Sequence, residues 1–363
     1  MSRLIERLDA QIAQAEGVFE RECLKARRAS ALARHGQFPE ARFALAGLRS
    51  QGQRLRNPVL SAWIALIEGL IEHCEALAPT ARDKFRRAHD LASTAGDTEL
   101  HALCAAWLAT SDFNANDVDA TVAHASLAHR LAPADSHAAR ARVALVIASA
   151  WRVAGDDARA QPWYQVARQH ATAEGDVSLV SVMLHNMAAF QAGRISLADA
   201  FGRADLADAQ RVLLEAESTG NYDAGVGNEQ LLAEVPLLRA QLLTVLGRHA
   251  DAIALFDAQL PRARGEGQLH REARFLADAV HAEVRLGRLD EAARRMRAVQ
   301  AALALMTEPD DIAATHARMA AAAEALGRME QARSYRTQAE AALARHEAEQ
   351  ARWSQALMDA QLG

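Results

Sequence analysis

The feature that most restricts the fold is a short pattern that recurs along the chain, a glycine followed five residues later by an alanine. The glycines are Gly36, Gly155, Gly193, Gly247, Gly287 and Gly327, and the alanines are Ala41, Ala160, Ala198, Ala252, Ala292 and Ala332. In four cases a small residue precedes the glycine by seven positions, namely Ala29, Ala148, Ala240 and Ala320. Such self-similarity at a fixed spacing is the sequence signature of a repeat protein.

The pattern has a physical explanation as the turn of a helical hairpin. A glycine adopts the left-handed backbone conformation that ends a helix without the strain that other residues incur. Small residues on both sides of it let two antiparallel helices cross closely. Two hairpins lack the glycine and are expected to turn near Ala78–Pro79 and near Asn114–Asp117. With steps of about forty residues, we expect about eight hairpins, preceded by a helix over residues 3–16.

The composition favours helices throughout. Alanine is abundant, whereas aromatic residues make up only 5% of the chain and there are only 8 prolines. Alanine has the highest helix propensity and no advantage in a sheet, so the predicted fold class is all-α. The net charge of −5 argues against a nucleic-acid partner, because binding to phosphates requires a cationic surface.

These repeats resemble the tetratricopeptide repeat (TPR) family over nearly the whole chain. The six glycine–alanine units match the helix-turn-helix core of that family. Their period is similar to its longer variant, found in sensory and regulatory regions of bacterial signalling proteins. The resemblance implies a right-handed α-solenoid, a TPR-like superhelix of about eight antiparallel helical hairpins. In such arrays the first helix of each pair lines a concave groove.

Two irregular segments set the expected domain boundaries. The step from Gly193 to Gly247 is 54 residues, and its surplus contains three glycines, so we expect an inserted flexible loop near 218–230. Residues 329–362 contain neither glycine nor proline, which predicts one long helix. We therefore expect three parts. They are an N-terminal capping helix at 1–17, the hairpin array at 18–328 and a long C-terminal capping helix at 329–363.

Motifs of enzymes and of metal sites are absent from the sequence. It contains no G-x4-G-K-[ST], no G-x-S-x-G and no H-E-x-x-H motif. Glu72, His73, Cys74 and Glu75 are adjacent, so on a helix their side chains point in different directions and cannot converge on one ion. We expect no catalytic residue, no metal and no cofactor.

The sequence also bears on the cellular compartment. The N-terminal segment is charged from the third residue, unlike a secretory signal, and no stretch approaches the roughly 18 apolar residues that span a bilayer. Cys23, Cys74 and Cys104 have spacings that suit neither a disulfide framework nor a zinc site. We expect a cytoplasmic protein with buried thiols and no membrane partner.

The resemblance implies which side chains face the groove. In the TPR family, first-helix residues 13, 10, 6 and 3 positions before the turn glycine tend to face inward. Among the residues at these positions, the candidate binding residues are Arg142, Arg152, Met183, Met187, Phe190, Gln241, Arg274 and His281. Methionine suits adaptable recognition surfaces and arginine pairs with carboxylates, so a partner with apolar and acidic residues is expected. The alternative is that the methionines and Phe190 are core residues and the arginines are simply solvated.

We expect a non-catalytic interaction scaffold or adaptor that binds a protein or peptide segment in this groove. The alternative is a regulatory sensor whose groove binds a small molecule or a signalling peptide, because the repeats are similar to the sensory halves of bacterial diguanylate cyclases. The sequence contains no G-G-[DE]-E-F motif of the cyclase itself.

The tail also carries an expectation about self-association. Trp353, Ala356, Leu357 and Ala360 form an apolar stripe with no hairpin assigned beneath it. This stripe predicts a homodimer through the C-terminal helix.

Overall fold

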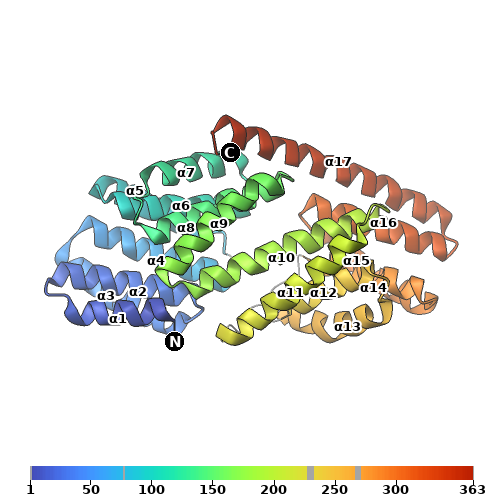
Figure 1. The fold of residues 1–363 in the computed structure, drawn as a ribbon, viewed down its shortest axis with the longest axis horizontal. Helices are drawn as coiled ribbons and strands as arrows, with labels where there is room; N and C mark the ends of the chain where they lie inside the picture. The colour runs from blue at the N-terminus through green and yellow to red at the C-terminus, as the bar shows by residue number, and fades with distance from the viewer. Residues whose placement is uncertain (1, 77, 227–232, 266–270, 363) are drawn as a thin grey trace. The chain divides into compact units, whose positions relative to one another are not determined.

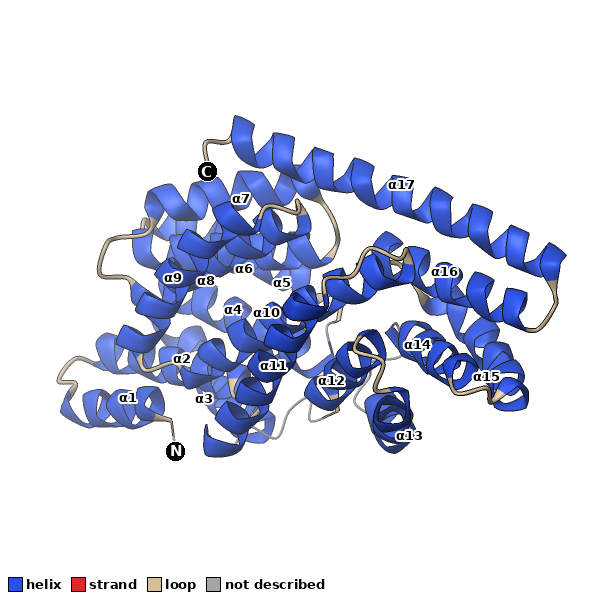
Figure 2. Ribbon diagram, turned by 45° about the vertical axis from the view of Figure 1, so that its right-hand side comes forward, coloured by secondary structure: helices blue, strands red, loops and turns tan. Residues whose placement is uncertain are grey.

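The computed structural model describes residues 2–76, 78–226, 233–265 and 271–362. Every regular element in these ranges is a helix, and Figures 1 and 2 show helices joined by loops. The prediction of an all-α fold is therefore confirmed for the described residues.

The helices follow one another along the chain with short connections. The first nine are α1 (Arg3–Gln14), α2 (Val18–Arg34), α3 (Phe38–Leu55), α4 (Pro58–Ala76), α5 (Ala81–Ala95), α6 (Thr98–Asn114), α7 (Val118–Leu131), α8 (His137–Val153) and α9 (Asp157–Glu174). The others are α10 (Val177–Ala200), α11 (Leu206–Val226), α12 (Glu234–Val245), α13 (His249–Gly265), α14 (Glu272–Arg285), α15 (Leu289–Ala302), the short 3₁₀ helix η2 (Leu303–Leu305), α16 (Pro309–Ala325) and α17 (Met329–Asp359).

Neighbouring helices pack in pairs, and alternate helices also pack on one another. Thus α8 packs on α9 and on α6, and α14 packs on α15 and on α16. A helix with two sets of neighbours buries more of its surface: α8 buries 13 of its 17 residues, whereas α9 buries 4 of its 18. This layered packing of adjacent pairs agrees with the predicted helical repeat.

Contacts divide the chain into two compact units. Unit 1 comprises Met1–Met183 and Gln350–Gly363, and unit 2 comprises Leu184–Glu349. Each has its own apolar core, which includes the buried ring of Phe85 in unit 1 and that of Phe256 in unit 2. These boundaries cut across the hairpin array that the sequence predicted as one domain.

Aspartates begin several helices, as their local chemistry favours. The side chains of Asp97, Asp117 and Asp156 each accept a hydrogen bond from the backbone N–H three residues later, at 3.0, 3.2 and 2.9 Å. These bonds satisfy first-turn amides that have no partner within the helix.

The predicted turn glycines are mostly confirmed, and one is wrong. Five of them have left-handed backbones with φ between 72° and 79°, namely Gly36, Gly155, Gly247, Gly287 and Gly327. The sixth, Gly193, lies inside α10. The turn between α10 and α11 is at Gly202 instead, with φ 72°, and Ala207 follows it at the same spacing of five. Two glycines fitted the pattern, and the sequence did not decide between them.

The inserted loop expected near 218–230 is corrected for the same reason. Because the turn lies at Gly202, α11 starts at Leu206 and continues to Val226, so residues 218–226 are helical. Residues 227–230 lie outside the described part of the chain. Within the described residues, the surplus length extends α10 and α11.

Two glycine-to-alanine substitutions test this turn assignment. At Gly193, an added Cβ meets no atom within 4 Å, so Gly193→Ala should stabilise the fold by about 0.5–1 kcal/mol through the higher helix propensity of alanine. At Gly202 the space is equally open, but the positive φ strains any L side chain, so Gly202→Ala should destabilise by about 1–2 kcal/mol. Equilibrium denaturation of both variants measures this; the opposite order of stability would contradict the assignment.

The tail forms one helix, as predicted. The helix α17 has 31 residues, and its last turns belong to unit 1. Trp353 is buried: its indole N–H donates to Asn116 Oδ1 at 3.2 Å, and its ring centroid lies 5.5 Å from that of Phe113. Leu357 is also buried, and the Leu362 carbonyl accepts a hydrogen bond from Trp151 Nε1 at 2.7 Å.

The burial of Trp353 and Leu357 within unit 1 bears on the predicted homodimer. Trp353 and Leu357, the largest residues of the stripe on which that prediction rested, are already covered within the chain's own fold. The homodimer stays a prediction, but these two side chains no longer support it.

Among the described residues, no helix combines the length and the apolar character needed to cross a bilayer.

Candidate functional site

The eight candidate binding residues are divided between the two units. Arg142 and Arg152 lie on α8, and Met183 lies on the part of α10 assigned to unit 1. The other five belong to unit 2, namely Met187, Phe190, Gln241, Arg274 and His281. Each set is therefore considered within its own unit.

In unit 2, Arg274 and Gln241 belong to a buried polar network around Asp278. The Asp278 carboxylate lies 3.3 Å from Arg274 Nη1 and accepts hydrogen bonds from Gln241 Nε2 at 3.0 Å and from Arg318 Nε at 3.1 Å. Ser196 Oγ lies 3.2 Å from the same carboxylate and accepts a 2.5 Å hydrogen bond from Arg274 Nη2. We call these five residues the Asp278 network.

The Asp278 network joins four helices through charged groups that are almost fully buried. Asp278 has 0% of its surface exposed, Arg274 1% and Arg318 3%. Burial alone would raise the pKa of Asp278, but Arg274 and Arg318 hold it below its usual value. Arg274 also lies 3.4 Å from Asp311. Arg274 is thus committed to internal partners, and for this residue the alternative interpretation of a simply solvated arginine is wrong.

The remaining unit 2 candidates are partly buried. Met187 and Phe190 are half-buried on α10, so Met187 is not a fully buried core residue. His281 is also half-buried, and burial together with Arg318 lowers its pKa to about 3. His281 is therefore uncharged at neutral pH and cannot act there as a cationic contact.

In unit 1, Arg152 is held by side chains of its own hairpin. It is 9% exposed, its Nε lies 3.5 Å from Asp157 Oδ1, and its Cζ lies 5.0 Å from the centroid of the Tyr164 ring. Met183 is 3% exposed, as expected of a core residue. Arg152 thus has a carboxylate within ion-pair distance, and Met183 is a core residue.

Arg142 differs from the other predicted arginines. It is 8% exposed, and its Cζ lies 3.8 Å from the centroid of the Trp107 ring on α6. No hydrogen bond or ion pair joins its guanidinium to any described residue, whereas Arg152 and Arg274 both have a carboxylate within ion-pair distance. Buried cations are normally paired, because desolvation destabilises the charged form. Arg142 is therefore a buried cation without a counterion in the described part of the chain.

Aromatic rings fix the position of this guanidinium. Trp107 stacks on Phe85 with ring centroids 5.6 Å apart, and the His73 ring lies edge-on to both, at 5.6 Å from Trp107 and 5.9 Å from Phe85. A guanidinium stacked on such a ring gains a cation–π attraction and leaves its N–H groups, which lie in its own plane, available at the edge.

The residues beside Arg142 leave one excess positive charge. Burial and Arg34 lower the pKa of Arg142 to about 9, so it remains protonated at neutral pH. Burial and Arg142 lower the pKa of His73 to about 4, and burial raises the pKa of the Cys74 thiol to about 11, so both are neutral. We call Arg34, His73, Cys74, Trp107 and Arg142 the Arg142 cluster.

The second cation of the cluster already has its partner. Arg34, at the end of α2, is ion-paired with Asp176, whose side chain is 3% exposed. Glu174, which also acts on Arg34, is itself paired with Arg7 at 2.8 Å. The pairing of Arg34 leaves Arg142 as the uncompensated charge.

Sequence reasoning identified Arg142 but missed Trp107 and Arg34. Trp107 precedes the turn residue Asn116 by nine positions and Arg34 precedes Gly36 by two, so neither matched the positions used to select groove residues. Their approach to Arg142 depends on how α2, α6 and α8 pack, which no local spacing records.

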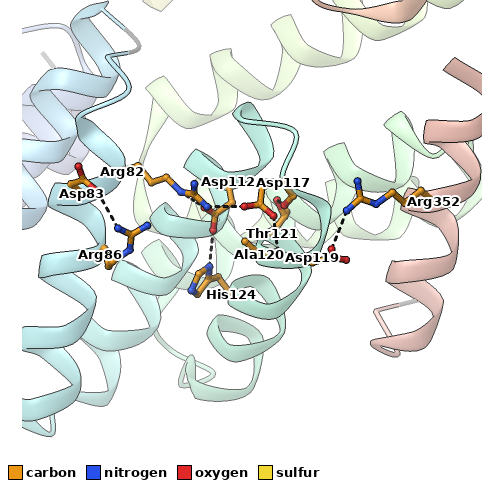
Figure 3. A network of polar contacts seen from close by, with 10 residues as sticks. All are labelled: Arg82, Asp83, Arg86, Asp112, Asp117, Asp119, Ala120, Thr121, His124 and Arg352. Carbon is orange, nitrogen blue, oxygen red and sulfur yellow. Dashed lines mark hydrogen bonds and ion pairs between the residues drawn. The ribbon is translucent and has the colours of Figure 1, made fainter. Parts of the chain in front are cut away.

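A second polar network in unit 1 serves the fold (Figure 3). Arg82 donates to Asp112 at 2.6 Å and to Asp117 at 2.9 Å, and His124 Nδ1 lies 2.6 Å from Asp112. Asp112 is fully buried, and Asp117 caps α7. These contacts join α5, α6 and α7 around the hairpin whose turn has Asn116 at φ 54° in place of a glycine. The network is internally satisfied and offers no open site.

Among the described residues, no three histidine, cysteine, aspartate or glutamate side chains converge on a position that could hold a metal ion. No family model matches the chain, and no curated protein matches its sequence. The Arg142 cluster is therefore the candidate site on its own geometry.

Proposed function

We propose that this chain is a non-catalytic interaction scaffold of TPR type, which binds a protein or peptide segment. The layered packing of adjacent helix pairs supports a repeat protein. The finer architecture that we propose is a right-handed superhelix of about eight hairpins. Its first helices, among them α6 and α8, line the binding face.

The observation that carries the proposal is the uncompensated charge of Arg142. An unpaired buried guanidinium lowers the stability of the free protein, whereas a negatively charged group of a partner would relieve this cost upon binding. The cation lies against the Trp107 ring, which itself packs on Phe85 and His73. A segment with an acidic residue beside apolar residues fits this chemistry.

Selection of random peptides on the wild-type chain, with counter-selection on Arg142→Met, tests the proposal. Enriched peptides should combine aspartate or glutamate with apolar residues, and their binding to Arg142→Met should be at least about tenfold weaker, since truncating one partner of a buried charge pair costs about 2–5 kcal/mol. Arg159→Met is the matched control. Arg159 also lies over a tryptophan, 4.9 Å from the Trp151 ring, but it is exposed and paired with Asp156.

The outcomes separate clearly. Equal peptide binding by the wild type and Arg142→Met would move the site away from the Arg142 cluster. Failure to enrich any peptide would contradict the scaffold function. Weakened binding by Arg159→Met to the same extent as by Arg142→Met would show that surface charge, rather than this buried cation, attracts the peptides.

A further inference from the structure

We propose that the Arg142 cluster binds one carboxylate group of the partner, which the edge of the stacked guanidinium holds through two parallel N–H···O hydrogen bonds. This inference rests on the proposed function and names the chemical group that the site recognises. It depends on the stacking of Arg142 on Trp107, on the absence of a counterion and on the neighbouring charges.

The geometry favours a planar acceptor. With Cζ only 3.8 Å from the centroid of the Trp107 ring, the indole occupies one side of the guanidinium, so a ligand approaches from another side. The donors at the guanidinium edge form a fork that matches the two oxygens of a carboxylate. A lysine at this position would present a point charge without that fork.

The charge balance favours a monoanion over a phosphate. Arg34 is neutralised by Asp176, and the low pKa values of His73 and His35, about 4 for each, leave both imidazoles uncharged at neutral pH. One unpaired positive charge thus remains in the cluster. A carboxylate matches it, whereas a phosphate dianion would bring a second negative charge that has no cation left in the cluster to pair with.

A role as binding anchor also predicts an unusual stability effect. Arg142→Met removes a buried charge that has no partner and keeps an unbranched side chain that packs well on an aromatic ring. The free variant should therefore melt at a higher temperature than the wild type. A guanidinium that merely supports the fold would give the opposite shift.

The experiment compares melting temperatures with sodium acetate, sodium phosphate and sodium chloride at matched ionic strength. Acetate should raise the melting temperature of the wild type and of Arg159→Met more than the other two salts do, and it should have no such specific effect on Arg142→Met. Arg142→Lys should retain only part of the acetate effect, because it keeps the charge but loses the fork. The Nε–H NMR signal that is missing from Arg142→Met, and so assigned to Arg142, should shift with acetate.

Three short peptides then identify the source of the carboxylate. Ac-Leu-Glu-Leu-NH2 carries it on a side chain, Ac-Leu-Leu-Leu-OH carries it at the C-terminus, and Ac-Leu-Gln-Leu-NH2 is the neutral control. Stronger binding of either acid than of the control supports the inference and shows which source is preferred. Equal binding of all three, a larger effect of phosphate than of acetate, or a lower melting temperature of free Arg142→Met would overturn it.

These results are separable from those of the peptide selection. If selected peptides bind in an Arg142-dependent way but show no preference for a carboxylate, the scaffold function stands and the carboxylate assignment fails. If no peptide binds, while acetate shifts the wild type and Arg159→Met but not Arg142→Met, the site is real and the scaffold function fails.

Discussion

Replacing Asp278 by alanine is expected to lower the free energy of unfolding by about 3–5 kcal/mol, because it leaves two buried guanidinium groups without their shared carboxylate. Arg274 and Arg318 are 1% and 3% exposed, so water cannot replace the lost partner without rearrangement of α14 and α16. Gln241 Nε2 loses its acceptor as well. The measurement is chemical denaturation followed by circular dichroism.

Tryptophan fluorescence shows which of the two units the Asp278→Ala substitution destabilises. All five tryptophans lie in unit 1, at positions 63, 107, 151, 163 and 353, whereas Asp278 lies in unit 2. A loss of helix signal without a matching change in tryptophan fluorescence therefore assigns the destabilisation to unit 2.

Asp83→Ala is the matched control for this prediction. Asp83 is also paired with an arginine, Arg86 at 3.1 Å, but 75% of its side chain is exposed, and exposed pairs contribute about 0–1 kcal/mol. Arg274→Met combined with Asp278→Ala should cost less than the sum of the two single changes, because both single variants remove the same contact between Arg274 and Asp278. An Asp278→Ala variant as stable as Asp83→Ala would contradict the structural role of the network.

Acidification from pH 7 to pH 5 is expected to lower the free energy of unfolding by roughly 5 kcal/mol in total, through three half-buried histidines. Burial, reinforced by Arg34, Arg142 and Arg318 respectively, lowers the pKa of His35 and His73 to about 4 and that of His281 to about 3. Their unperturbed pKa is 6.5. At pH 5 each contributes a loss of about 2 kcal/mol relative to neutral pH.

The sign follows from which state binds the protons. Below about pH 6.5 the unfolded chain protonates these imidazoles, while the folded chain keeps them neutral until the pH approaches 4 or 3. The unfolded state therefore binds more protons in this window, and stability falls as the pH falls. Above pH 7 neither state binds them, so their effect disappears.

Denaturation curves at several pH values between 5 and 7.5 measure the effect. His73→Gln should reduce the pH slope of stability, by up to about 1.4 kcal/mol per pH unit. Two of the three histidines, His35 and His73, lie in unit 1, which also contains all five tryptophans. Tryptophan fluorescence should therefore report the loss of stability caused by both of these histidines, which is larger than the loss from one. A stability that is constant from pH 7 to pH 5 would show that these imidazoles are charged in the folded protein.

Most of the turns between helices could be predicted from the sequence. Five glycines of the repeated pattern were assigned correctly, because a left-handed helix end restricts the residue type strongly and locally. Gly193 and Gly202 both match the same pattern, and an alanine follows each by five residues. Only the continuation of α10 to Ala200 distinguishes them, and helix continuation depends on packing as well as on the local sequence.

The candidate site was predictable only in part. Arg142 was identified from its position before Gly155, but Arg152 and Arg274, chosen by the same rule, have Asp157 and Asp278 within ion-pair distance. Arg274 and Asp278 have the spacing of an ordinary exposed ion pair on one helix. Their burial depends on contacts with α10, α12 and α16, which come from distant parts of the chain.

The sequence by itself determined the all-helical class, the positions of most turns and the continuity of the tail helix, because helix propensity and glycine conformation act over a few residues. The tertiary structure alone decided which charged side chains have partners. It placed Asp278 between two arginines, Asp176 beside Arg34, and Trp353 against unit 1. Pairing of this kind depends on distances between residues far apart in the chain, and the same packing leaves Arg142 without a counterion.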